Sequence, residues 1–263
     1  MLELKNIYKT FNPGTINEKR ALNGLNLKLN EGDFVTVIGG NGAGKSTMLN
    51  AVAGTWPVDE GQILIDNIDV TKLSEHKRAT YLGRVFQDPM TGTAATMGIE
   101  ENLALAKRRG KSRLLRSGIT KAEREEYKEL LKILGLGLED RLTSKVGLLS
   151  GGQRQALTLL MATLQKPKLL LLDEHTAALD PKTAAKVLEI TDMIVNRDHL
   201  TTLMITHNMK DAIAHGNRLI MMMEGKSFWI SREKKEKLTV KNLLDQFEKA
   251  SGEEFSNDSA LLG

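Results

Sequence analysis

Short apolar segments recur along the chain, separated by longer segments with a helical pattern of apolar residues. Residues 34–38 (FVTVI), 169–172 (LLLL) and 203–205 (LMI) are continuously apolar, as strands are in a parallel sheet covered on both faces. Residues 2–7 and 25–29 alternate apolar and polar side chains, as half-exposed strands do. The remaining β-like segments are residues 62–65, 84–87 and 218–223. Strands that alternate with helical segments predict an α/β fold.

The pattern changes between about Asp88 and Met161, where β-like segments disappear and the sequence becomes helical and charged. We interpret this region as a helical subdomain inserted into the α/β core, within one domain at residues 1–230. Residues 231–263 are expected to form a C-terminal helix and tail. The apolar face of that helix is expected to consist of Leu238, Val240, Leu243, Leu244 and Phe247.

Composition narrows the class of protein. The 263 residues are 41% hydrophobic and 27% charged, with a net charge of +4 and no cysteine. The charge is too small to indicate nucleic-acid binding without a basic reading surface, and the absence of cysteine fits a reducing compartment. No apolar run is long enough for a signal peptide or a membrane span. We therefore expect a cytosolic protein, or one peripheral on the cytosolic side of a membrane. Seven basic residues lie in Lys107–Lys121; we favour a solvated face over a surface for anionic lipid.

Residues 39–47, GGNGAGKST, match the phosphate-loop pattern through Gly39, Gly44, Lys45 and Ser46. A strand precedes the loop and a helix follows it, which is the context that the motif needs. Backbone N–H groups and the helix N-terminus can surround phosphate oxygens. Lys45 is expected to reach the β- and γ-phosphates, and the Ser46 hydroxyl to ligate Mg²⁺.

Polar side chains follow three of the predicted strands. Asp173 and Glu174 end the apolar segment LLLLDE. Ionised carboxylates at the end of a buried strand are costly unless they are paired or bind a metal. Asp173 is placed to hold Mg²⁺ and Glu174 to act as general base on a water molecule. His207, which ends the predicted strand TLMIT at residues 202–206, is expected to hydrogen-bond the γ-phosphate. Gln87, at the end of residues 84–87, is expected to contact both Mg²⁺ and the water.

An adenine base needs an apolar or stacking contact, and aromatic residues make up only 4% of the chain. Phe11 is our candidate for stacking on the base, with Tyr8 as the alternative; either could instead belong to the core. No segment typical of guanine recognition occurs, which favours ATP.

A second glycine turn, LLSGGQRQ at residues 148–155, has no lysine. The motifs follow one another as the phosphate loop, Gln87, this glycine turn, LLLLDE, ALD at residues 178–180, and His207. In this order the chain resembles the ATP-binding cassette (ABC) family over residues 1–230. The resemblance implies a P-loop NTPase core with a mainly parallel sheet, an N-terminal antiparallel β subdomain and the helical insertion. It also implies that two cassettes pack head to tail, so that each glycine turn closes over the ATP of the other chain. The residues expected to contact nucleotide are Phe11, Gly39, Asn41, Gly42, Ala43, Gly44, Lys45, Ser46, Thr47, Ser150, Gly151, Gly152, Gln153 and Asp180. Lys45, Gln87, Glu174 and His207 are expected to be catalytic, and Ser46, Gln87 and Asp173 to hold Mg²⁺.

One position departs from the family pattern. His175 stands where the family usually has proline after the glutamate, and we favour a space-filling role over an influence on the pKa of Glu174. The sequence around these motifs resembles one bacterial subgroup, the ATPases of uptake systems with a lipoprotein receptor, linked to tryptophan or tyrosine.

We therefore expect the ATP-hydrolysing subunit of a membrane importer. It is expected to work as a homodimer on the cytoplasmic face of the cell membrane, beneath separate permease chains and without nucleic acid. Residues 88–102, with Met90 and Met97, are the candidate permease contact. The alternatives are a cytosolic ABC ATPase that acts in complex assembly and a nucleotide-sensing module without turnover. The presence of both Glu174 and His207 argues against the second.

Overall fold

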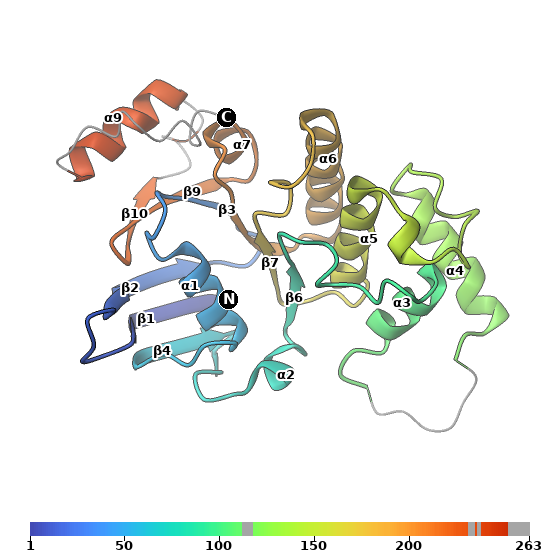
Figure 1. The fold of residues 1–263 in the computed structure, drawn as a ribbon, viewed down its shortest axis with the longest axis horizontal. Helices are drawn as coiled ribbons and strands as arrows, with labels where there is room; N and C mark the ends of the chain where they lie inside the picture. Colours follow the sequence, from blue (N-terminus) through green and yellow to red (C-terminus); the bar gives the residue numbers. More distant parts are fainter. Residues whose placement is uncertain (112–117, 231–234, 236–237, 252–263) are drawn as a thin grey trace.

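The computed structural model describes residues 1–111, 118–230, 235 and 238–251. The N-terminal part contains an antiparallel sheet, drawn in blue and cyan in Figure 1. Its strand order is β2 (Lys19–Leu29), β1 (Leu2–Phe11), β4 (Glu60–Ile65) and β5 (Ile68–Asp69). This sheet confirms the antiparallel N-terminal β subdomain that the resemblance implied.

A second sheet crosses the middle of the molecule. Its order is β10 (Lys226–Ile230), β9 (Arg218–Met223), β3 (Phe34–Ile38), β8 (Thr201–Ile205), β7 (Leu169–Asp173) and β6 (Leu82–Val85). The strands from β9 to β6 pair in parallel, and β10 is antiparallel to β9. The prediction of a mainly parallel sheet is confirmed. The sequence pattern did not predict β5 or the edge strand β10.

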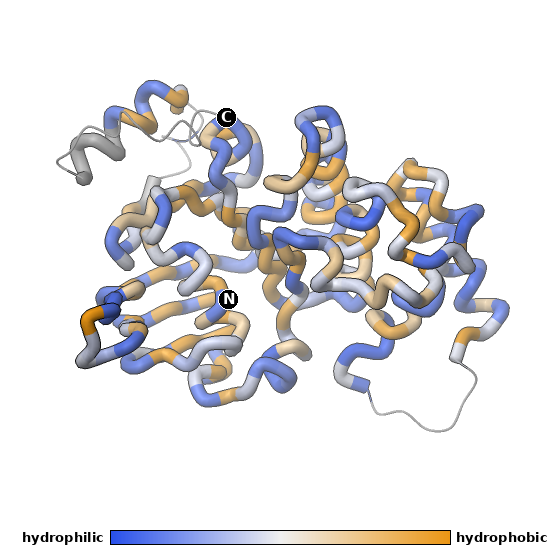
Figure 2. The backbone as a smooth tube through the Cα atoms, viewed as in Figure 1, coloured by the Kyte–Doolittle hydropathy of each residue, from blue (hydrophilic) through white to orange (hydrophobic). Residues whose placement is uncertain are grey.

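The continuously apolar strands face two different cores. Every residue of β3 and β8 is buried. In β7, Leu169 and Leu171 pack with α1 (Lys45–Ala53) and the N-terminal sheet, whereas Leu170 and Leu172 pack with the helices on the other side. Because successive side chains of a strand point to opposite faces, a strand covered on both sides is mostly apolar, and a buried polar residue such as Thr36 needs a hydrogen-bond partner, here the Ala212 carbonyl oxygen. Figure 2 shows this concentration of apolar residues along the central strands.

Helices form the region between β6 and β7, as the sequence predicted. They are α3 (Ile99–Lys107), α4 (Lys121–Lys132), the 3₁₀ turn η1 (Val146–Leu148) and α5 (Gly151–Thr163). The described part of residues 88–161 contains no strand. In Figure 1 these helices lie on the opposite side of the central sheet from the N-terminal sheet. The other helices are α2 (Glu75–Arg78), α6 (Pro181–Asp198), α7 (Met209–Ala214) and α9 (Val240–Ser251).

The predicted C-terminal helix corresponds to α9. Leu243 is buried with Met209 of α7 and Leu219 of β9, and Leu238, Val240 and Leu244 are partly buried beside it. The fifth predicted residue of this face, Phe247, lies outside the side chains that the structure describes. Among the described helices, none combines the length and the apolar character that a membrane crossing requires.

Three residues at the start of the basic segment Lys107–Lys121 are engaged by the chain itself; residues 112–117 lie outside the described residues. The Lys107 Nζ lies 2.5 Å from a carboxylate oxygen of Glu126, and an Arg108 Nη lies 2.8 Å from one of Glu123. Arg109 donates to the Gln165 carbonyl oxygen at 3.1 Å. These contacts favour an intramolecular role over a lipid-binding surface.

The parallel strands end at one level, and this alignment positions the site. Ile205 of β8 is the register partner of both Val37 of β3 and Asp173 of β7. The segments that follow these three strands therefore meet at the carboxyl edge of the sheet, where open α/β sheets bind their ligands.

Candidate active site

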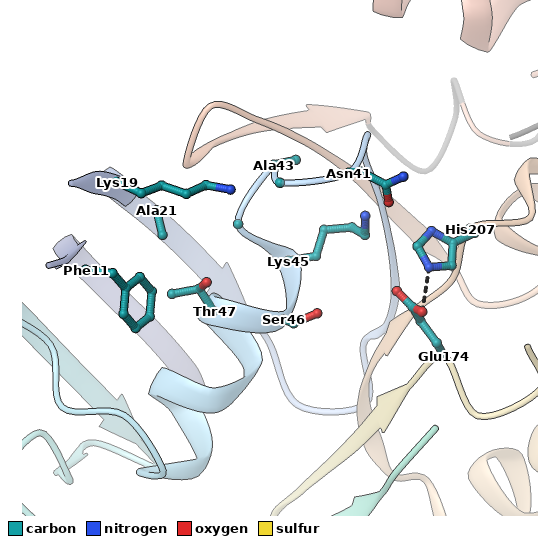
Figure 3. A pocket seen from close by; sticks show the side chains of 12 residues that line it. Phe11, Lys19, Ala21, Asn41, Ala43, Lys45, Ser46, Thr47, Glu174 and His207 are labelled. Atoms are coloured by element: carbon teal, nitrogen blue, oxygen red, sulfur yellow. Dashed lines mark ion pairs between the residues drawn. The ribbon is translucent and has the colours of Figure 1, made fainter. Parts of the chain in front are cut away.

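A cavity of about 430 Å³ opens at this edge, between the N-terminus of α1 and the N-terminal sheet. Figure 3 shows its side chains converging from both sheets. It is lined by Phe11, Lys19, Ala21, Asn41, Gly42, Ala43, Gly44, Lys45, Ser46, Thr47, Glu174 and His207. The structure thus brings together most of the residues that the sequence analysis predicted to bind the nucleotide of their own chain.

The phosphate loop is held by its own lysine and by a glycine that tolerates no side chain. The Lys45 Nζ donates to the carbonyl oxygens of Gly39 at 2.6 Å and Gly40 at 3.2 Å. Gly44 has φ +99°, and a Cβ there would lie 2.4 Å from the carbonyl oxygen of Ala21. Glycine is required because any other residue would be strained and would collide with β2.

The N-terminus of α1 faces the cavity without a capping side chain. Ser46 and Thr47 lie in its first turn and line the cavity. N–H groups of a first helical turn have no partner within the helix, and they carry the positive end of the helix dipole. This end of the cavity is therefore suited to an anion, with the Ser46 hydroxyl available as an oxygen donor.

Glu174 follows β7 in a left-handed backbone conformation, with φ +48°. A glutamate rarely adopts this conformation, and such strain is concentrated at functional sites. Its carboxylate lines the cavity, and its Oε2 lies 2.5 Å from the Nε2 of His207. Both side chains thus reach the cavity, as the sequence predicted; His207 lies two residues beyond the end of β8 rather than at its last residue.

The neighbouring Asp173 has different surroundings. It is absent from the cavity lining, and its Oδ2 lies 3.5 Å from an Nη of Arg84 on β6. Burial raises the pKa of Asp173, the guanidinium of Arg84 opposes that shift, and the charge of Glu174 adds to it. The two adjacent acids therefore separate into a cavity-facing group and a group that contacts Arg84.

Gln87 is not brought into this cavity. Strand β6 ends at Val85, two residues before Gln87, so the predicted strand 84–87 extended too far. Gln87 is exposed, and its proposed contacts with Mg²⁺ and water stay a prediction. The buried Gln155 of α5 holds the preceding backbone, because its Nε2 donates to the Phe86 carbonyl oxygen at 3.1 Å.

Phe11 lines the cavity, whereas Tyr8 does not. The ring of Trp56 meets the ring of Phe11 edge-on, with centroids 5.1 Å apart and an interplanar angle of 81°. This T-shaped packing fixes the orientation of Phe11. The observation favours Phe11 over Tyr8 as the stacking residue, and the stacking itself stays a prediction.

The second glycine turn begins α5. The Ser150 Oγ accepts from the Gln153 N–H at 3.3 Å, and the Gln153 Oε1 accepts from the Ser150 N–H at 3.2 Å, which makes a reciprocal helix cap. Ser150, Gly152 and Gln153 line a separate cavity of about 440 Å³ beside α6. In Figure 1, α5 lies beyond β6 and β7 from α1, so this turn does not reach the phosphate loop of its own chain.

Asp180 is the N-cap of α6, and Pro181 is its first residue. The Asp180 Oδ1 accepts from the Thr183 N–H at 3.1 Å. Hydrogen bonding to the Thr183 side chain, and then to backbone N–H groups that include that of Thr183, lowers the pKa of Asp180. Asp180 thus has a capping role within the chain, and its proposed contact with a second chain stays a prediction. His175 is buried and packs against α6, with its Nε2 3.1 Å from the Thr191 Oγ1, which agrees with the space-filling interpretation.

The sequence analysis missed Lys19 and Arg84. Lys19 faces the cavity because it is the register partner of Phe11 across β1 and β2. Arg84 bridges the Asn50 Oδ1, at 2.8 Å, and Asp173. Both residues occupy strand positions that a motif search does not weigh, and only the strand register reveals them.

The geometry agrees with what comparisons with known proteins find. A family model described as ABC transporter matches residues 22–177. The chain is 45% identical over 252 residues to the tyrosine transport ATP-binding protein of Clostridioides difficile (strain R20291), covering 95% of this chain and 100% of that protein. It is 33% identical over 228 residues to the spermidine/putrescine import ATP-binding protein PotA of Haemophilus influenzae (strain ATCC 51907 / DSM 11121 / KW20 / Rd), covering 86% of this chain and 56% of that protein.

The fold is also similar to a solved structure, the dimeric post-hydrolysis state of the ATP-binding cassette MJ0796 bound to ADP and Pi. The TM-score is 0.73 at 32% identity, covering 87% of this chain and 98% of that chain. With the family match and the full-length relative, this similarity leads to one conclusion: the chain belongs to the ABC transporter family and is an ATPase subunit of such a transporter.

Proposed function

We propose that this chain is the ATPase of an importer and works as a homodimer that encloses two ATP molecules. The observation that carries the proposal is the position of Ser150. The serine begins α5 in a cavity of its own, apart from the phosphate loop. A helix N-terminus of this kind can complete an anion site on a second chain. The dimeric state of the related cassette MJ0796 supports the same arrangement.

Hydrolysis in this proposal uses the groups at the carboxyl edge of the sheet. Glu174 takes a proton from the attacking water, and His207 contacts the γ-phosphate. Mg²⁺ would be held by Ser46, Asp173 and Gln87, whose hydroxyl, carboxylate and amide oxygens are the donors that this ion prefers. The carboxylate of Asp173 is partly buried and lies 3.5 Å from Arg84, so in this proposal it would hold the ion beside that guanidinium. The ion, when bound, neutralises charge on the phosphates.

We place the permease contact at residues 88–102, which lead from Gln87 into α3. Met90 is 42% exposed there, so a charge can be introduced at this surface without being buried in the core. Met90→Glu should abolish uptake while the ATPase rate of the isolated chain stays unchanged. Normal uptake by this variant would exclude the segment. Met97, the other candidate, is partly buried and is the weaker probe.

The transported substrate in this proposal is an aromatic amino acid, brought by a lipoprotein receptor. Support comes from the full-length relative whose name is tyrosine transport ATP-binding protein. Cells that lack this chain should lose uptake of labelled tyrosine, and Glu174→Gln should fail to restore it. Retained tyrosine uptake, with loss of uptake of another solute, would reassign the substrate without changing the role of the chain.

The dimer can be tested with Ser150→Arg. In a Glu174→Gln background, ATP should produce a dimer that light scattering detects, and Ser150→Arg should return it to a monomer. Affinity of that monomer for ATP should be unchanged, because the bulky cation occupies the place of a second chain's γ-phosphate. Loss of ATP binding to the monomer would show that residues 148–155 serve their own chain, and the head-to-tail dimer would be wrong. A mixed dimer of a Lys45→Ala chain and a Ser150→Arg chain has one site with an intact Lys45 from one chain and an intact Ser150 from the other. Activity recovered on mixing the two variants would support the head-to-tail dimer.

A further inference from the structure

Lys19 places a second ammonium group at the nucleotide cavity, in addition to that of Lys45. It begins β2 and is the register partner of Phe11 on β1. Directly opposed residues of an antiparallel pair project to the same face of the sheet, so the aromatic ring and the ammonium share one wall of the cavity. Figure 3 shows the Lys19 side chain extending from β2 toward the phosphate loop.

The ammonium reaches the loop itself. The Nζ of Lys19 lies 3.0 Å from the position that a Cβ would occupy on Gly42. Lys45 contacts the loop from the other side, where its Nζ donates to the carbonyl oxygens of Gly39 and Gly40. The two cations therefore flank the phosphate loop, and they meet different parts of a ligand that lies along it.

The charges around the cavity leave Lys19 available to an anion. It is exposed, and no hydrogen bond or ion pair joins it to any of the residues that the structure describes. Among the described residues, Glu174 is the only acid that lines the cavity, and its carboxylate contacts His207 at the far end. Nothing in the described lining competes with a phosphate for this ammonium.

The order of the residues along the cavity indicates which phosphate of a nucleotide lies beside Lys19. Phe11 stands at one end of the cavity and Glu174 with His207 at the other, with Lys19 beside Phe11 and Lys45 nearer to Glu174 (Figure 3). A nucleotide with its base against Phe11 and its terminal phosphate toward Glu174 passes Lys19 first. We infer that Lys19 binds the α-phosphate of the nucleotide, in a contact common to ATP and ADP.

This inference rests on the proposed position of the base and the phosphates, and it adds a consequence. A cation at the α-phosphate holds substrate and product equally, because neither bond order nor charge at that phosphate differs between them. Lys19 therefore contributes to retention of nucleotide rather than to the distinction between ATP and ADP, which is left to groups around the terminal phosphate.

Isothermal titration of the full chain with ADP and with AMP tests the inference. Lys19→Ala should raise the Kd of both, roughly tenfold for ADP, as expected for one charge-assisted hydrogen bond, and at least as much for AMP, whose phosphate carries more negative charge. Lys19→Arg should restore most of the affinity, because a guanidinium also pairs with phosphate. The matched control is Arg20→Ala, which removes the same charge from the next residue of β2, on the opposite face, and should leave both Kd values near wild type. Equal melting temperatures of the variants would exclude unfolding.

Lys45→Ala separates this inference from the proposed function. This variant should raise the Kd of ADP and leave the Kd of AMP nearly unchanged, because AMP has no β-phosphate. The assignment of Lys19 to the α-phosphate is overturned if the Lys19→Ala chain binds ADP as tightly as the Arg20→Ala chain does. It is also overturned if Lys19→Ala raises the Kd of ADP but not that of AMP. If Lys45→Ala leaves ADP binding intact, the phosphates do not lie along residues 39–47, and the proposed site fails whatever Lys19 does.

Discussion

Glu174 and His207 contact each other across the ends of two neighbouring parallel strands, with 2.5 Å between Oε2 and Nε2. Glu174 reaches this position from a left-handed backbone turn directly after β7, and His207 from the segment after β8. The carboxylate that is proposed as the base is therefore held by the residue that is proposed to contact the γ-phosphate. ATP must enter a cavity in which this acid is already paired.

Glu174→Gln should separate binding from turnover. The amide keeps the size of the side chain and removes the base, so we expect the rate of ATP hydrolysis to fall by about 10²–10⁴-fold. ATP should still bind, because the phosphate loop is unchanged. Phosphate release and equilibrium binding, measured on the same preparation, check this. A rate near that of the wild type would refute the role of Glu174, and Lys45→Ala, which should lose affinity instead, is the contrasting variant.

His207→Ala should weaken ATP binding, partly because it leaves the charge of Glu174 unpaired in front of the phosphates. In that case the effect of Glu174→Gln on ATP affinity should differ between the two backgrounds. It should be more favourable in the His207→Ala chain than in the wild type. The double-mutant cycle measures this coupling between the two side chains. ATP affinities obtained by titration of all four proteins should be non-additive. Additive effects would mean that this contact in the nucleotide-free protein does not influence binding.

Gly152→Ala should destabilise the protein through packing. A Cβ at Gly152 would lie 2.1 Å from the Thr183 Cγ2 on α6, whereas a Cβ at Gly151 would lie 3.2 Å from the Leu179 Cδ2. We expect Gly152→Ala to lower the free energy of unfolding by about 1–3 kcal/mol, as overpacking does, and Gly151→Ala to lower it less.

Thr183→Ser supplies the control for this effect, because it removes the methyl group that the new Cβ would meet. The loss of stability should be smaller for Gly152→Ala in the Thr183→Ser chain, measured by urea unfolding. An equal loss in both backgrounds would contradict close packing of α5 on α6 as the reason for glycine at this position.

Much of the fold was predictable because burial on both faces leaves a clear pattern in the sequence. Strands β3, β7 and β8 were predicted from their apolar runs, since each faces one core with its odd residues and another with its even ones. The edge strand β10 was not predicted. It pairs with β9 on one side only, so its sequence is under weaker constraint, and its five residues, KSFWI, do not alternate polar and apolar side chains.

The site divides in the same way. Lys45, Ser46, Glu174 and His207 belong to segments with a local signature, and the structure places all four around one cavity. Lys19 depends on a long-range relationship that no local pattern encodes, the register between β1 and β2. The roles of Gln87 and Ser150 depend on a nucleotide and on a second chain, which no pattern within one chain encodes.

The buried His175 should make the protein less stable in mild acid. Burial, with a smaller effect from the charge of His215, lowers the pKa of His175 to about 4 from an ordinary value of 6.5. Between these two values the unfolded chain binds a proton that the folded chain excludes, so stability falls as the pH falls. The contribution is fully present above pH ~6.5, and its loss amounts to about 3 kcal/mol once the pH reaches the folded pKa.

His175→Gln tests this prediction, because its amide N–H can still donate to Thr191, whose own hydroxyl donates to the Val187 carbonyl oxygen at 2.8 Å. Urea unfolding at pH 7 and pH 5 should show that the wild type loses about 2 kcal/mol more than the variant. Burial raises the pKa of Asp173 and Asp211, which shifts stability in the opposite direction, but both acids are present in the two proteins and cancel in the comparison. Parallel pH profiles for wild type and variant would show that His175 does not titrate as a buried neutral group.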